Sequence, residues 1–235
     1  PMTTNTADAE TLVRLVEETG AVFALTHNYT GYPMVRQARE MIAADELGEI
    51  RAVRANYVQG WMWAVDPTQP AERGTWKDDP RRNGPGATIG DVGTHAYNLA
   101  RYMSGLQPAE VLGKLTTFSG RQLDDYGHSL VRCLNDALIM VTVSQVTHGR
   151  LNDLSIEIDG DKASLSWRQE EPDSLTIRQT GQPQRIYDRA PGQAHMNDSG
   201  NAACRIPGGH PEAFFEAFAN VYSSAYDDMI WRVVG

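Results

Sequence analysis

The chain has 235 residues, 41% of them hydrophobic and 22% charged, which are the proportions of an ordinary soluble globular protein. Its formal net charge of -9, without any cluster of Lys or Arg, argues against nucleic acid and anionic membrane surfaces as partners, because both repel an acidic protein. No apolar run approaches the roughly 20 residues of a membrane span. The two cysteines form no CxxC pair, so we expect a cytoplasmic protein with free thiols.

The first elements in chain order resemble the second half of a βαβ unit. Residues 5–19 predict a helix, because Leu12 and Val16 share one face and Gly20 can cap the end. Residues 21–25 are continuously apolar, as in a strand buried on both faces of a parallel sheet. We therefore expect a helix followed by a strand, with the first strand of the unit missing.

The next elements alternate between helix, strand and loop. A second helix follows Pro33 and ends before Leu47, and the alternating pattern of residues 49–61 predicts a strand. Residues 64–90 are rich in Pro, Gly, Asp and Arg and predict a long ordered loop. A third helix is expected from about residue 92 to residue 103, with a glycine past its end.

Seven strand candidates follow in close succession, with turn-like residues between them. They span residues 109–118, 128–134, 137–147, 153–159, 162–168, 173–179 and 184–188. Short connections require antiparallel neighbours, so these segments and the strand near residues 50–60 predict one large antiparallel sheet. Residues 189–209 are expected to be irregular, and a last helix begins near Pro211. We expect an α+β fold, with helices on one face of the sheet and a partner subunit on the other.

The segment Gly84 to His95, which reads GPGATIGDVGTH, is the strongest candidate for chemistry. Asp91 and His95 are four residues apart, so on a helix their carboxylate and imidazole can share one pocket. A histidine is a natural acceptor for an alcohol proton, and a nearby carboxylate can orient it or stabilise its charged form. From spacing alone, Asp91 can equally be the N-cap of the helix and His95 a hydrogen-bonded core residue.

The same segment resembles the central motif of the glucose-fructose oxidoreductase / inositol dehydrogenase (Gfo/Idh/MocA) family. Further segments resemble the family in the same order: THNY at 26–29, LGEI at 47–50, WKDDP at 76–80, YNLA at 97–100 and GHPE at 209–212. The last of these is similar to the tail of a sugar-dehydrogenase branch that includes levoglucosan-type enzymes.

The resemblance implies half of an NAD(P)-dependent sugar, anhydrosugar or polyol dehydrogenase. Residues 1–27 would be a remnant of the dinucleotide-binding Rossmann domain. Residues 28–235 would be the substrate-binding and oligomerisation domain. The resemblance implies for it an α+β fold of the dihydrodipicolinate reductase-like C-terminal type, with a large, mostly antiparallel sheet, that forms a dimer or tetramer. Pro1 matches the proline of the family's Glu-Lys-Pro tripeptide, which would place the catalytic lysine just before it. NAD or NADP would be bound mainly by the other domain, so this part alone is expected to be inactive.

The resemblance also implies roles for individual residues. His95 would be the general base and Asp91 its polar partner. The substrate-binding positions would be Tyr29, Gln59, Trp61, Lys77, Asn98 and His210, and the cofactor-binding positions Asn28 and Trp76. Lys77 stands where the family usually has Arg, and Asn98 where many members have Asp, so both depart from the pattern. Tyr29 and Trp61 can also be core aromatics, and His210 can simply precede a proline-initiated helix.

Three further interpretations complete the sequence analysis. The other histidines, which are His27, His128, His148 and His195, are expected to be structural or exposed, and no ligand spacing predicts a metal site. The protein can instead be a non-catalytic module that dimerises and binds a carbohydrate or protein ligand; a lysine just upstream of Pro1 would favour the enzyme. A metal-dependent sugar isomerase or hydrolase that uses Asp91 and His95 is the third possibility, which metal analysis would test.

Overall fold

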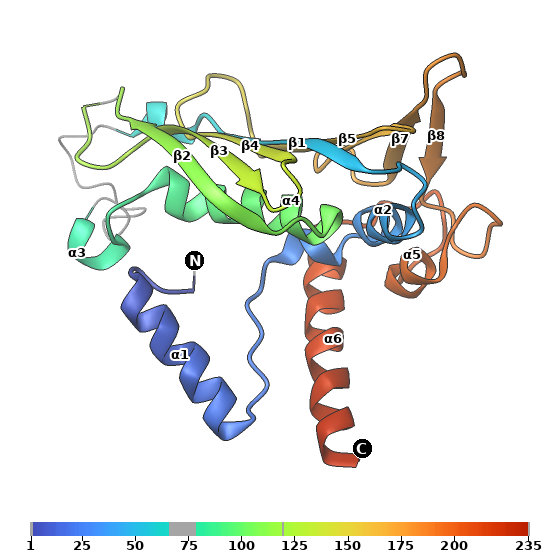
Figure 1. Cartoon of the computed structure of the whole chain (residues 1–235), viewed down its shortest axis with the longest axis horizontal. Helices are drawn as coiled ribbons and strands as arrows, with labels where there is room; N and C mark the ends of the chain where they lie inside the picture. Colours follow the sequence, from blue (N-terminus) through green and yellow to red (C-terminus); the bar gives the residue numbers. More distant parts are fainter. Residues whose placement is uncertain (1, 66–78, 119, 235) are drawn as a thin grey trace.

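A computed structural model of the chain describes residues 2–65, 79–118 and 120–234. Within these residues, eight strands form one sheet, and the helices lie on one side of it (Figure 1). The strands are β1 (Ile50–Val58), β2 (Pro108–Thr116), β3 (Tyr126–Cys133), β4 (Leu138–Ser144), β5 (Asp153–Gly160), β6 (Ser164–Arg168), β7 (Ser174–Arg178) and β8 (Arg185–Asp188). The predicted α+β fold with a large sheet is confirmed.

The order of the strands in the sheet is β2-β3-β4-β1-β5-β6-β7-β8. Neighbouring strands are antiparallel except for β1 and β4, which are parallel, with Val53 opposite Ile139 and Tyr57 opposite Val143. A parallel pair needs a long crossover connection, and here that connection carries helix α4. The predicted large, mostly antiparallel sheet is confirmed, and β1 with β4 is its one parallel pair.

The two faces of the sheet differ in polarity. The face toward the helices is a continuous apolar core, which includes Val53, Ala55, Ile139, Val141, Leu154, Ile156 and Ile158. Helices α2 (Pro33–Ala43) and α4 (Thr94–Ser104) cover the centre of this face. On the opposite face, Arg54 forms ion pairs with Glu157 and Asp159 across β1 and β5. Leu112 and Leu130, which face each other across β2 and β3, lie on this same open face.

Helix α4 begins from a π-helical turn, Ile89–Gly93, which contains Asp91. The helix buries Ala96, Leu99, Ala100 and Met103. It ends at Gly105, whose left-handed backbone (φ 72°) lets its N–H donate to the carbonyl of Arg101. The third predicted helix is therefore present, with two residues of its start replaced by the π-helical turn. Such turns are frequent at functional sites.

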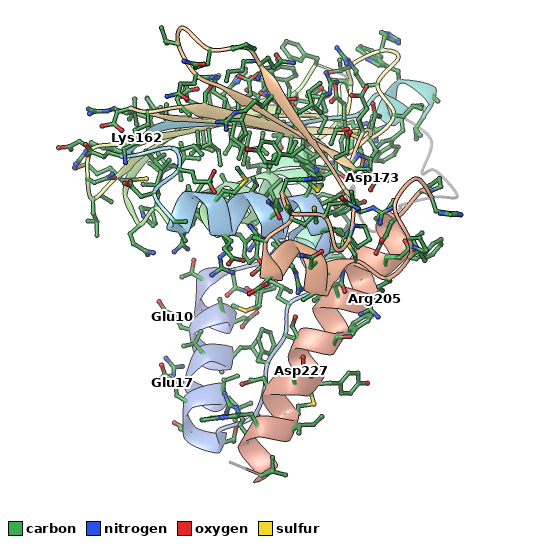
Figure 2. The ribbon with its side chains drawn as sticks, turned by 90° about the vertical axis from the view of Figure 1, so that its right-hand side faces the viewer. Glu10, Glu17, Lys162, Asp173, Arg205 and Asp227 are labelled. Atoms are coloured by element: carbon green, nitrogen blue, oxygen red, sulfur yellow. The ribbon has the colours of Figure 1, made fainter. Side chains whose placement is uncertain are left out.

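Helices α1 (Thr6–Thr19) and α6 (Phe214–Val234) project away from the sheet on its helix-covered side (Figures 1 and 2). The side chain of Asn5 caps the start of α1, yet no residue of this helix is buried. Near the far ends of the two helices, Arg232 donates a hydrogen bond to the carbonyl of Gly20. In this part of the chain the helices expose much of their apolar surface.

The strand predicted at residues 21–25 is wrong. The backbone there forms no strand, and Phe23 and Leu25 are 47% and 40% exposed. A strand exists through the hydrogen bonds of its neighbours, and none of the eight described strands pairs with this segment. The apolar run is thus real, but the partner that would make it a strand is not present among the described residues.

The remaining elements are short helical segments. They are 3-10 turns at Asn28–Gly31 and Trp61–Ala64, α3 (Pro80–Asn83) and α5 (Asp198–Ala203). Helix α5 lies within the stretch expected to be irregular. It forms because the side chain of Asn197 accepts the N–H of Gly200, while a fully buried ion pair between Arg189 and Glu212 anchors the surrounding loop. None of the described helices combines the length and apolar character that a membrane span requires.

Candidate functional site

The side chains best suited to catalysis or binding meet where three parts of the chain converge. The 3-10 turn before α2 contributes His27 and Tyr29, the end of β1 contributes Tyr57, and the start of α4 contributes His95. The ring of His95 makes edge-to-face contacts with all three of the others, at centroid distances of 5.0, 5.2 and 6.3 Å for His27, Tyr29 and Tyr57. These rings hold the imidazole of His95 in a partly buried position.

Burial sets the protonation of the two histidines. It lowers the pKa of His95 below its ordinary value, and the carboxylate of Asp91 opposes this effect. Burial, with a smaller contribution from the nearby His95, lowers the pKa of His27 to about 4. Both imidazoles are therefore neutral near pH 7. A neutral imidazole has a lone pair that can accept a proton from an alcohol.

Asp91 lies in the π-helical turn, one turn before His95. Its backbone N–H donates to the carbonyl of Ala87 (2.8 Å), as in the interior of a helix, and helix α4 has no side-chain cap. The N-cap alternative for Asp91 is therefore wrong. Its Oδ2 accepts a hydrogen bond of 3.1 Å from Nε2 of Gln145. The amide of Gln145 is fixed in this orientation because its Oε1 accepts the hydroxyl of Thr88.

A continuous polar network extends from Asp91 across the ends of β4, β1 and β5. Nε2 of Gln145 lies 3.2 Å from Oε1 of Gln59, which also accepts the indole N–H of Trp61 at 3.1 Å. Nε2 of Gln59 in turn donates to Oδ1 of Asn152 at 2.8 Å. Two of the predicted substrate-binding side chains, Gln59 and Trp61, are thus bonded to each other and linked to Asp91.

Asn152, which precedes β5, connects this network to the two tyrosines. Its Oδ1 accepts the hydroxyl of Tyr57 at 2.7 Å, and its Nδ2 donates to the hydroxyl of Tyr29 at 3.2 Å and to Oε1 of Gln169 at 2.9 Å. The two phenol oxygens lie 2.5 Å apart. Burial raises the pKa of both tyrosines, so each phenol keeps its proton and can act as a hydrogen-bond donor.

The remaining predicted site residues differ in their placement. Asn28 is buried, and its Nδ2 has no hydrogen-bond partner among the described residues. Asn98 is partly buried on α4, three residues after His95. His210 is exposed, and its backbone carbonyl accepts a bond from Arg189, so no contact of the described residues joins it to the network. Trp76 and Lys77 lie outside the residues that the structure describes.

Four residues of the site were not predicted as functional. His27 was expected to be structural or exposed, yet its Nδ1 lies 3.3 Å from Nδ1 of His95. Tyr57 was recognised only as an alternating strand position, and a tyrosine on the core face of a strand is a usable signal for a polar contact. Gln145 and Asn152 follow β4 and precede β5, and no local pattern marks them. Because β1 lies between those strands, Gln59 at its end bonds to both residues.

An apolar pocket of about 490 Å3 lies on another side of α4, toward β2 and β3. It is lined by residues that include Ile89, Tyr97, Val111 and Val131, and neither Asp91 nor His95 is among them. We place the candidate site at the polar network and not at this pocket, because the network holds the titratable and hydrogen-bonding groups that chemistry requires. Within the described residues, no group of three or more His, Cys, Asp or Glu side chains is arranged to hold a metal ion.

The chain is similar in sequence to known oxidoreductases. The chain is 29% identical to the oxidoreductase YfiI of Bacillus subtilis over 225 residues, which is 94% of this chain and 57% of that protein. It is 26% identical over 200 residues to the levoglucosan dehydrogenase of Pseudarthrobacter phenanthrenivorans, covering 75% of this chain and 50% of that protein.

A solved relative extends the likeness to the fold. The structure of an inositol dehydrogenase homolog from Azotobacter vinelandii with NAD+ is 33% identical, with a TM-score of 0.89, and the match covers 96% of this chain and 58% of that chain. The chain therefore spans between half and three fifths of the length of these relatives. The model of the GFO/IDH/MocA C-terminal domain matches residues 35–166. This chain belongs to the Gfo/Idh/MocA family, and the matched residues are its C-terminal domain.

Proposed function

We propose that this chain is the substrate-binding part of an NAD(P)-dependent oxidoreductase that acts on a hydroxyl group of a sugar, an anhydrosugar or a polyol. The observation that carries the proposal is the placement of a neutral His95 beside the Asp91 carboxylate, at one end of a network of amides and phenols. The Azotobacter vinelandii homolog also has a structure with NADH and myo-inositol, and a second relative is a levoglucosan dehydrogenase, which supports a polyhydroxylated substrate.

Oxidation of an alcohol removes a hydride from carbon and a proton from oxygen. NAD or NADP, when bound, supplies the hydride acceptor. His95 accepts the proton on Nε2, because its Nδ1 faces His27 and the described residues offer Nε2 no hydrogen bond. The carboxylate of Asp91 raises the pKa of His95, so it favours the charged imidazolium that forms as the proton arrives.

The polar network provides the groups that recognise hydroxyls. Gln59 and Trp61 present an amide and an indole at the end of β1, and Asn98 adds a second amide one turn beyond His95. We propose that these three side chains contact the substrate. The second hydrogen on Nε2 of Gln59 and the amide of Asn98 can bond to hydroxyls, whereas Trp61, whose indole N–H donates to Gln59, offers its ring face. The hydroxyl of Tyr29 already bonds to Tyr57 and to the amide that precedes β5, which fits the core-aromatic alternative for Tyr29 better than a direct substrate contact.

Asn28 is the described residue that best fits a contact with the cofactor or with the substrate beside it. A buried amide N–H without a partner costs on the order of 1–3 kcal/mol, so such groups are rare unless a ligand satisfies them. Nδ2 of Asn28 is buried and unpaired among the described residues, and the next residue, Tyr29, touches the ring of His95. A ligand oxygen near His95 would satisfy this donor.

The exposed apolar surfaces fit the proposed domain division. Residues 1–27 are proposed as a remnant of the dinucleotide-binding domain and residues 28–235 as the substrate-binding and oligomerisation domain. Support comes from α1, which buries nothing, and from Val13, Leu15 and Phe23, which are exposed apolar residues of the kind that another domain covers. The open face of the sheet is proposed as the surface between subunits.

The test is an activity assay on the full-length protein, with NAD+ or NADP+ and a panel of polyols, sugars and anhydrosugars, read as formation of reduced nicotinamide. His95→Ala should lower kcat by about 10² to 10⁴-fold and leave the Kd for NAD(P) nearly unchanged. The melting temperature of the variant must stay close to that of the wild type. Wild-type kcat in a folded His95→Ala variant would refute the proposal. Binding of a sugar by calorimetry without any turnover would instead favour the non-catalytic carbohydrate-binding module.

A further inference from the structure

His27 and His95 form a pair of imidazoles from parts of the chain that are 68 residues apart in sequence. Their Nδ1 atoms are separated by 3.3 Å, and the ring planes are almost perpendicular, at 86°. At this distance one nitrogen must carry a hydrogen and the other a lone pair, because two lone pairs or two N–H groups would repel each other. The tautomer of each ring is therefore coupled to the tautomer of the other.

The backbone around His27 holds this residue in place independently of its ring. Its N–H donates to the carbonyl of Leu25 at 2.8 Å. Its carbonyl accepts two bonds from Thr30, one from the backbone N–H at 3.2 Å and one from the hydroxyl at 2.8 Å. The backbone of His27 is thus held in a closed turn, and the edge-to-face contact with His95 (centroids 5.0 Å apart) describes how the two rings meet.

We infer that His27 accepts the Nδ1 proton of His95 and thereby keeps the lone pair of Nε2 of His95 available to the substrate hydroxyl. This inference rests on the proposed function, in which His95 is the general base. If Nδ1 of His27 instead donated to Nδ1 of His95, the hydrogen of the neutral His95 ring would be on Nε2. Nε2 could then not accept a proton from the substrate. In serine protease triads a carboxylate sets the imidazole tautomer; here a second imidazole performs the same task, which makes His27 a positioning residue.

The surrounding charges agree with this direction of the bond. The groups that face the pair are the phenols of Tyr29 and Tyr57 and the carboxylate of Asp91. Burial holds the pKa of His27 at about 4, so its lone pair is present at neutral pH. The Asp91 carboxylate favours the charged form of His95, which marks His95 as the member that takes up the proton. Once charged, His95 still donates from Nδ1 to His27, and a charge-assisted bond is stronger.

The tautomers can be measured directly on the chain labelled with 15N-histidine. Long-range 1H–15N correlation spectra at neutral pH should show His95 protonated at Nδ1 only and His27 protonated at Nε2 only. In His27→Phe, which keeps a ring but removes the acceptor, His95 should shift toward the Nε2–H form. His195→Phe, at an exposed histidine outside the network, serves as the matched control and should leave His95 unchanged. An Nε2–H tautomer of His95 in the wild type would overturn the inference.

Kinetics of the full-length enzyme give the second readout. His27→Phe should lower kcat by roughly 10- to 100-fold with little change in KM. This is less than the about 10⁴-fold loss when the carboxylate partner of a triad histidine is replaced by an amide that imposes the wrong tautomer. His27→Asn should restore most of the rate, because its Oδ1 can accept a bond near the position of Nδ1. Wild-type kcat in His27→Phe, with His95→Ala inactive, would refute the inference and leave the proposed function standing. An active His95→Ala would refute the proposed function, and the spectra would then decide on the pair alone.

Discussion

Replacement of Asn152 by alanine is the sharpest test of the polar network. The side chain of Asn152 makes four hydrogen bonds, to Tyr57, Gln59, Tyr29 and Gln169, at distances between 2.7 and 3.2 Å. These bonds join the 3-10 turn before α2, the end of β1 and the start of β5. We predict that Asn152→Ala destabilises the fold and also reduces activity, because Gln59 loses the acceptor that fixes its amide.

The magnitude follows from the number of bonds. A hydrogen bond between neutral side chains contributes a net value of about 1 kcal/mol, so four bonds set an upper scale of about 4 kcal/mol. Asn152 is only partly buried, and water can replace some of the lost partners. We therefore expect the free energy of unfolding to fall by about 3 kcal/mol. For a chain of this size, that loss corresponds to a decrease in Tm of roughly 6–12 °C.

Thermal and urea unfolding monitored by circular dichroism would measure this loss. Asn56→Ala is the matched control, because Asn56 is also partly buried, lies on the open face of β1 and makes no side-chain hydrogen bond within the described residues. The control should change the free energy of unfolding by less than about 0.5 kcal/mol. If Asn152→Ala is no more destabilising than Asn56→Ala, the network does not hold the site together and the reasoning above is wrong.

Three further outcomes are expected. Gly31→Ala should lower the free energy of unfolding by roughly 1–3 kcal/mol, because a Cβ there would collide with the backbone carbonyl of Ala217 in the first turn of α6. Gly113→Ala, with ordinary space around it, should be tolerated, and equal urea midpoints for the two variants would contradict this. The free energy of unfolding should fall as pH drops from about 6.5 toward 4, because the unfolded chain binds a proton at His27 in that range and the native chain does not. In urea titrations at several pH values, His27→Phe should reduce this dependence of the free energy of unfolding on pH. Leu112→Glu on the open sheet face should lower the oligomeric state measured by light scattering, and a monomeric wild type would refute an interface there.

Local sequence patterns were sufficient for the longer helices, but not for the short α3 and α5. In α1, apolar spacing, an asparagine before the first turn and Gly20 after the last specify both the helix and its ends. The same kinds of signal located α4 and its glycine cap. The four-residue spacing of Asp91 and His95 indicated that the two groups lie one turn apart, and the Asp91 carboxylate is near enough to raise the pKa of His95. These features depend on interactions within a few residues, which the sequence displays directly.

Pairing between distant segments was not predictable in the same way. The strand at 21–25 has the right composition, but a strand also needs a hydrogen-bonded neighbour, which composition does not reveal. The positions of Gln145 and Asn152 beside Gln59 depend on β1 lying between β4 and β5, which is a tertiary choice. His27 was missed for the same reason, since its partner lies 68 residues away and no local pattern links the two.

The central position of β1 has a consequence for how the protein reaches its folded state. Strands β2, β3 and β4 follow one another along the chain and pair in that order, as do β5 to β8, so each group can form from contacts that are close in sequence. β4 and β5 do not pair with each other, and β1 must dock between them through contacts with residues far away in sequence. Such long-range closure is slow.

Gln59 lies just beyond β1, and its partners Gln145 and Asn152 lie one on each side, so the polar network forms in the same step that joins the two halves of the sheet. A folding intermediate with both strand groups formed but β1 undocked would have most of its hydrogen-bonded sheet and no assembled site.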